Sequence, residues 1–91
     1  MKFVDFLKSV EKKSKFEKFL LKNAEEQNLV SDVDFENFLS KFAFDALKTS
    51  DTYVIDVLYF ALYEKFLVVY LRYLKAKTDH LLAVEKIAGG A

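Results

Sequence analysis

The chain has 91 residues, enough for one small domain, and 53% of them are hydrophobic, above the usual share of about 45–50%. It contains no cysteine, which excludes disulfides and thiolate metal sites, and its formal net charge of zero argues against a strongly basic nucleic-acid-binding protein. Asp5 and Lys8 stand where a signal peptide needs an unbroken apolar run, so we expect a cytoplasmic protein.

Apolar residues recur at helical spacing through the first 27 residues. Those before residue 11 and those after residue 15 fall on different sides of one straight helix, which predicts two helices rather than one. The stripe of the first ten residues, continued along a straight helix, would turn Ser14 and Glu17 inward. Those two residues also form the capping-box pattern that starts a new helix. We therefore favour a break between Glu11 and Lys15, with a second helix running to about Gln27. One long helix whose ends pack against different neighbours is the alternative.

The next segment predicts an amphipathic third helix that ends near Lys48. Ser31 is a good N-cap, and Asp32 and Asp34 place negative charge in the positive first turn of the helix. Apolar residues then follow one face, namely Phe35, Phe38, Leu39, Phe42 and Ala46. We expect this face to pack against the rest of the chain.

The most apolar stretch is Tyr53–Leu74, in which 18 of 22 residues are apolar or aromatic. It predicts a central helix over about 52–77. Nearly all of the circumference of this helix is apolar, so other parts of the protein must cover it on several sides. The charged residues of the region gather in one sector of roughly 100°, and they are Glu64, Lys65, Arg72, Lys75 and Asp79.

The end of the chain leaves two interpretations open. Thr78 or Asp79 can cap a separate final helix, or the central helix can continue to Ala88. In both cases we predict a single helical domain over residues 1–88 and a flexible tail over residues 89–91. The fold class is therefore all-α, a small bundle of four to five helices around one long apolar central helix.

The central stretch has the length of a transmembrane helix, for which about 20 residues are needed. However, Glu64 and Lys65 lie near its middle, and each charge there costs roughly 2.5–3.5 kcal/mol on insertion. The core helix of a soluble protein explains the same residues without that cost. We expect no membrane partner.

Residues that carry chemistry are sparse. His80 is the only histidine, and no Glu-x-x-His or His-x-x-x-His spacing surrounds it. No glycine-rich phosphate loop is present, because both glycines, Gly89 and Gly90, lie at the end of the chain. We therefore expect no enzyme activity, no cofactor and no metal.

A row of aromatic residues on one side of the central helix is the first candidate site. Tyrosine combines apolar area with a polar end, which suits protein interfaces, although aromatic residues at helical spacing are also typical of a core. Because three short helices leave much of the central helix uncovered, we expect a non-enzymatic interaction or structural protein that self-associates, with a homodimer favoured. The interface residues of this prediction are Tyr59, Tyr63, Phe66 and Tyr70.

Two other functions stay open at this stage. Lysines on one helix face can contact nucleic-acid phosphates, although a solvated surface is the simpler interpretation, and the single arginine, Arg72, argues against reading of bases. An adaptor or inhibitor that docks on a larger complex is the third function. The lysines share one face only if the first two helices are continuous, and they are Lys8, Lys12, Lys15 and Lys22.

Overall fold

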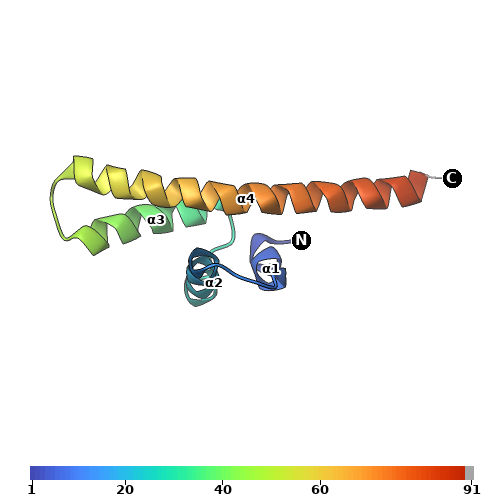
Figure 1. Cartoon of the computed structure of the whole chain (residues 1–91), viewed down its shortest axis with the longest axis horizontal. Coiled ribbons are helices and arrows are strands. Elements are labelled where there is room, and N and C mark those ends of the chain that lie inside the picture. Colours follow the sequence, from blue (N-terminus) through green and yellow to red (C-terminus); the bar gives the residue numbers. More distant parts are fainter. Residues whose placement is uncertain (90–91) are drawn as a thin grey trace.

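The computed structural model describes the backbone of residues 1–89 and the side chains of residues 1–83. Over residues 1–89 the chain is all-helical, and no strand is present, which confirms the all-α prediction. The molecule is elongated, with extents of 61 × 22 × 21 Å (Figure 1). The four helices are α1 (Phe3–Ser9), α2 (Lys15–Gln27), α3 (Asp32–Leu47) and α4 (Thr52–Gly89).

The chain breaks between α1 and α2 where the sequence predicts it. The backbone is extended at Val10, and the Nζ atom of Lys13 donates to the carbonyl oxygens of Lys8 (3.1 Å) and Val10 (2.8 Å), which satisfies the end of α1. Ser14 then begins α2 with a complete capping box. Its hydroxyl accepts from the Glu17 backbone N–H, and the Glu17 carboxylate accepts from the Ser14 backbone N–H, each over 3.1 Å.

The connections from α2 to α3 and from α3 to α4 are short, and residues within them or next to them determine where the helices end and begin. Asn28 and Lys48 take left-handed backbone conformations, with φ of 55° and 49°, and so end α2 and α3. Ser31 caps α3 as predicted, in a second capping box with Asp34. The carboxylate of Asp51 accepts from a backbone N–H in the first turn of α4 over 3.0 Å.

Aromatic rings from three helices meet at the centre of the core. Phe3 of α1 packs edge-on against Phe35 of α3 (5.1 Å between ring centroids) and against Phe66 of α4 (5.7 Å). Phe35 and Phe66 stack on each other at 5.3 Å. The Tyr73 hydroxyl donates to the Met1 carbonyl oxygen over 2.7 Å and fixes α1 on α4. We call Phe3, Phe35 and Phe66 the aromatic centre.

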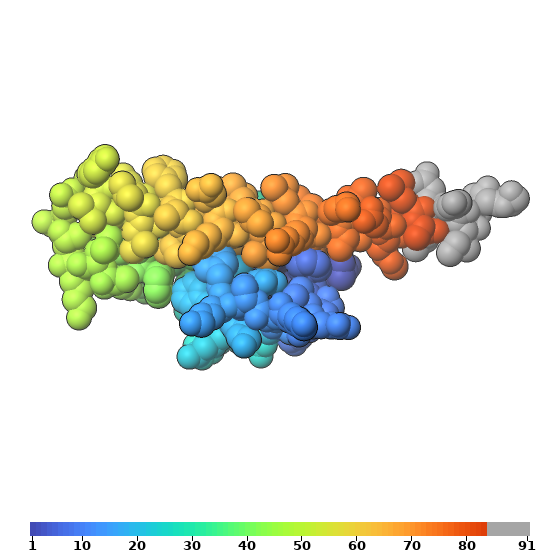
Figure 2. Space-filling model, viewed as in Figure 1, coloured from blue at the N-terminus to red at the C-terminus, as the bar shows by residue number. Residues whose placement is uncertain are grey.

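The short helices cover only one side and one end of α4. Figure 1 shows α3 lying antiparallel along the N-terminal half of α4, with α1 and α2 crossing below its middle. The C-terminal part of α4 continues beyond α1. In the space-filling view, no other element lies on the edge of α4 that faces away from α1 and α2 (Figure 2).

Helix α4 is longer than the predicted 52–77. It runs without interruption through Thr78 and Asp79, so the alternative of a separate final helix is wrong. The physical reason is that no proline or glycine occurs between residues 52 and 88 to interrupt the hydrogen-bond ladder. Gly89, predicted as the start of a tail, is the last residue of α4, and residues 90–91 of that tail lie outside the described residues.

Replacing Phe66 with alanine should lower the free energy of unfolding by about 3–5 kcal/mol, because the change leaves a cavity between Phe3 and Phe35. Phe66 is 1% exposed, whereas Phe44 on α3 is 58% exposed and provides a matched control. The Phe44→Ala change should cost at most about 1 kcal/mol. Urea unfolding followed by circular dichroism measures both, and equal losses would contradict the central role of Phe66.

Candidate interaction surfaces

An uncovered row of apolar side chains follows the length of α4. Its members recur at alternating intervals of four and three residues, which is the heptad spacing of a coiled-coil contact. All nine are exposed, and the apolar ones are 37% to 76% exposed. We call this row the outer seam; it consists of Tyr53, Val57, Phe60, Glu64, Leu67, Leu71, Leu74, Thr78 and Leu81.

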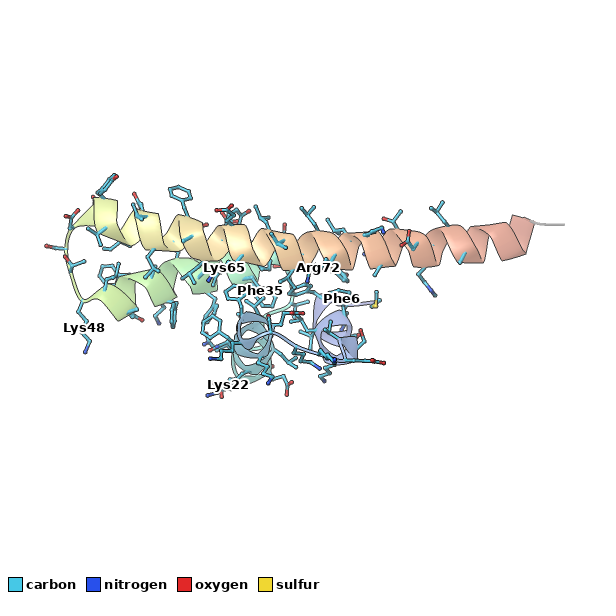
Figure 3. All side chains as sticks on the ribbon, viewed as in Figure 1. Phe6, Lys22, Phe35, Lys48, Lys65 and Arg72 are labelled. Carbon is cyan, nitrogen blue, oxygen red and sulfur yellow. The ribbon has the colours of Figure 1, made fainter. Side chains whose placement is uncertain are left out.

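The outer seam lies on the side of α4 opposite the core. Residues that face inward include Phe66, Val69 and Tyr73, all buried against the rest of the chain. Figure 3 shows side chains projecting from the edge of α4 that faces away from α1 and α2, with no other element over them in this view. One border of the seam is also mostly apolar and exposed, and it contains Val54, Ala61, Val68, Lys75 and Leu82.

The four residues predicted as the interface are brought together, but beside the core of their own chain. Tyr59 stacks on Tyr63 at 5.7 Å, and Phe66 lies between Tyr63 (6.1 Å) and Tyr70 (5.4 Å). Phe66 is fully inside the aromatic centre, and the three tyrosines are half-buried against it. The structure therefore uses Phe66 within the chain, and an interface role for the tyrosine edges stays a prediction.

Two of these tyrosines, Tyr59 and Tyr70, have a raised pKa. Burial raises the pKa of Tyr59, and the negative charge of Glu36 nearby raises it further. The Tyr59 hydroxyl also donates to the Glu36 carboxylate at 3.4 Å, a long contact. Burial likewise raises the pKa of Tyr70, with a contribution from Asp32. Burial and the nearby carboxylates both favour the neutral form of each phenol. This is expected for tyrosine rings at the edge of a core.

The lysines of the nucleic-acid alternative are exposed but do not form one helical stripe. Lys8 is on α1, Lys12 is in the connection, and Lys15 and Lys22 are on α2. Figure 3 shows Lys22 on the side of α2 that faces away from α4. Because α1 and α2 are separate helices, the continuity on which a shared face depends is missing. Nucleic-acid binding itself stays an untested prediction.

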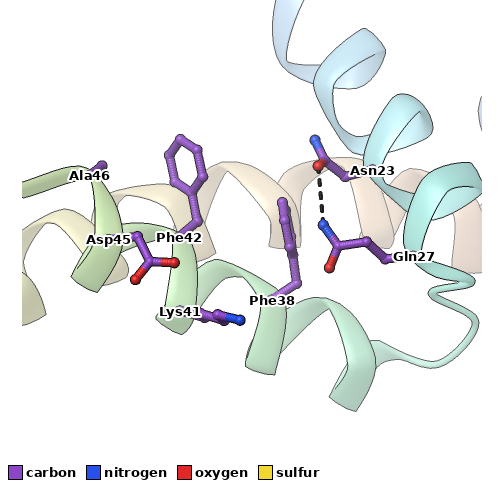
Figure 4. A pocket seen from close by; sticks show the side chains of 7 residues that line it. All are labelled: Asn23, Gln27, Phe38, Lys41, Phe42, Asp45 and Ala46. Atoms are coloured by element: carbon purple, nitrogen blue, oxygen red, sulfur yellow. Dashed lines mark hydrogen bonds between the residues drawn. The ribbon is translucent and has the colours of Figure 1, made fainter.

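A shallow groove of about 390 Å³ lies between α2 and α3 (Figure 4). Phe38 and Phe42 form its apolar part, and Asn23 accepts a 3.4 Å hydrogen bond from Gln27 at one side. The titratable residues of its lining are Lys41 and Asp45. This lining offers no nucleophile with an adjacent base, so we assign no reaction to the groove.

The described part of the chain also bears on metal binding and on membrane crossing. Its histidine, aspartate and glutamate side chains form no group of three or more that could hold a metal ion. Over the same residues, no helix combines the length and the apolarity that a bilayer crossing requires. Comparison with models of protein families, with characterised proteins and with solved structures finds no match to this chain.

Tyr70→Phe should make the fold less sensitive to alkaline pH. In the unfolded chain Tyr70 ionises near its ordinary pKa of 10.0, whereas the raised pKa in the folded chain keeps the proton on, so the free energy of unfolding falls as the pH rises above about 10. Phenylalanine cannot ionise and removes this loss.

Urea unfolding near neutral pH and above pH 10 measures the effect. If the Tyr70→Phe variant retains the alkaline loss of the natural chain in full, the burial of Tyr70 does not govern its ionisation.

Proposed function

We propose that this protein is a non-enzymatic interaction protein that self-associates through the outer seam of α4, with a homodimer as the basic assembly. The observation that carries the proposal is the seam itself. Seven apolar side chains at heptad spacing stand exposed opposite the core of their own chain. Heptad spacing over four repeats is the pattern by which one helix packs along another.

The area of the seam supports a stable contact. With the exposed fractions of its apolar side chains, the seam presents on the order of 800 Å² of accessible surface per chain. A typical specific interface buries about 800 Å² on each partner. Contiguous apolar patches of several hundred Å² are rare on monomers and mark interaction sites. Covering this patch therefore provides enough area for a dimer without any contribution from the groove.

The chain cannot cover the seam with its own helices. α1 and α3 already pack on the inner side of α4, where Phe3 and Phe35 contact Phe66. α2 packs on α1. These contacts leave the seam free for a partner, and a second copy brings a seam of the same shape and length.

A Leu71→Glu change should shift the protein from dimer to monomer. Leu71 is 61% exposed at the middle of the seam, so a carboxylate there is tolerated in the free chain but is desolvated in the dimer. Size exclusion with light scattering, from micromolar to near-millimolar concentration, should give twice the mass of one chain for the natural protein and one mass for the variant.

Val33→Glu serves as the control for this change. Val33 is 55% exposed on α3, outside the seam, and its change to glutamate should leave the dimer intact. Circular dichroism should show unchanged helix content in both variants. A natural chain that stays monomeric over the whole concentration range would remove the proposal.

A further inference from the structure

Glu64 is the charged member of the outer seam, and its position limits how two copies can pair. In a parallel, in-register pair, each seam residue lies level with the same residue of the other copy. Two Glu64 carboxylates would then meet inside an apolar contact, where like charges repel and the lost hydration is costly. An antiparallel pair separates them.

We propose that two copies pair antiparallel along the outer seam, with the two-fold axis at the level of Val69; this inference rests on the self-association proposed above. In this register Glu64 lies level with Leu74 of the second copy and beside Lys75 of the second copy. The two Glu64 residues are ten residues apart in level, about 15 Å along the helix axis. Each Glu64 carboxylate therefore lies near the Lys75 ammonium group of the second copy and not near the other Glu64 carboxylate.

The remaining positions are complementary in the same register. At the centre, Leu67 lies level with Leu71 of the second copy, and toward the ends Val57 lies level with Leu81. On the apolar border, Val68 meets its own counterpart across the axis. All five residues are exposed in the single chain. The register thus buries apolar side chains against apolar side chains along most of the contact.

The antiparallel register shifted one step toward the N-terminus is less favourable. Moving the axis to between Lys65 and Phe66 puts the two Glu64 residues only about 4.5 Å apart in level. It would place Asp56 beside Lys77 of the second copy, but an exposed ion pair of that kind contributes little. Two carboxylates close together within the seam outweigh that contact.

Antiparallel pairing also uses the part of α4 that extends past α1. In Figure 1 this part lies alongside no other helix of its own chain. Reversing the second copy places it beside the N-terminal half of the other α4, where α3 already packs. In a parallel pair, the C-terminal parts of the two α4 helices would instead contact only each other.

Spin-label distances test the orientation, and the chain has no cysteine, so single cysteines label cleanly. Lys65, Arg72 and Asp79 are exposed and seven residues apart, on one stripe beside the seam. With the axis at Val69, the axial offset between equivalent labels is about 12 Å for Lys65→Cys, about 9 Å for Arg72→Cys and about 30 Å for Asp79→Cys. Double electron–electron resonance on the dimer measures the three distances.

Each outcome of this experiment decides a different point. Similar short distances at residues 65 and 72 with a long one at residue 79 support the inference. Three equal distances would establish a parallel pair and overturn it, while self-association would stand. Strongly unequal distances at residues 65 and 72, in either sense, would overturn the register. A single-chain mass by light scattering would remove the proposed function itself.

A charge exchange tests the contact between Glu64 and Lys75. Glu64→Lys and Lys75→Glu should each raise the dissociation constant of the dimer about fivefold, because each places like charges together twice per dimer. The double variant restores opposite charges and should return the constant to within about twofold of the natural value. Sedimentation equilibrium measures all three, and a double variant no tighter than the single ones would overturn the register.

Discussion

The packing of Phe3 against Phe35 and Phe66 holds the fold together, because it joins the first helix to the third and the fourth. This contact anchors α1 together with the hydrogen bond from Tyr73 to Met1, since the seven residues of α1 are too few to form a stable helix alone. α2 in turn packs on α1 and also directly on α3, where the Phe19 ring contacts Phe38 (5.6 Å between ring centroids) and Phe42 (5.0 Å). The aromatic centre therefore decides which side of α4 is inside and, by exclusion, which side stays exposed.

Helix α4 is apolar on two opposite sides, and only one of them is used within the chain. Most soluble helices have a single apolar stripe and a polar remainder, and their stability comes from burying that stripe. Here the polar residues are confined mainly to one flank, where Lys65, Arg72 and Asp79 lie. The second apolar side stays largely exposed in the isolated chain, and the proposed dimer would bury it. The proposed function thus rests on the outer seam, which lies outside the chain's own core.

The sequence predicts the local features well and the choice of faces poorly. The capping boxes of Ser14 and Ser31 follow from residues three positions apart, so the breaks before α2 and α3 could be placed. The inward side of α4 could not be predicted, because two of its sides are apolar. Which of them is buried depends on Phe3 and Phe35, which are distant in the sequence. The tyrosine row stood out by composition, whereas the outer seam was missed. Its four-three spacing is visible in the sequence and was the signal that could have found it.

The hydrogen bond between Tyr73 and Met1 joins residues 72 positions apart. During synthesis at about 5–20 residues per second, several seconds separate Met1 from Tyr73, so this hydrogen bond forms only after α2, α3 and half of α4 have been made. Contacts over such separations slow folding relative to local ones. Phe3 can pack on Phe35 of α3 earlier, but its contacts with Phe66 and Tyr73 wait for α4.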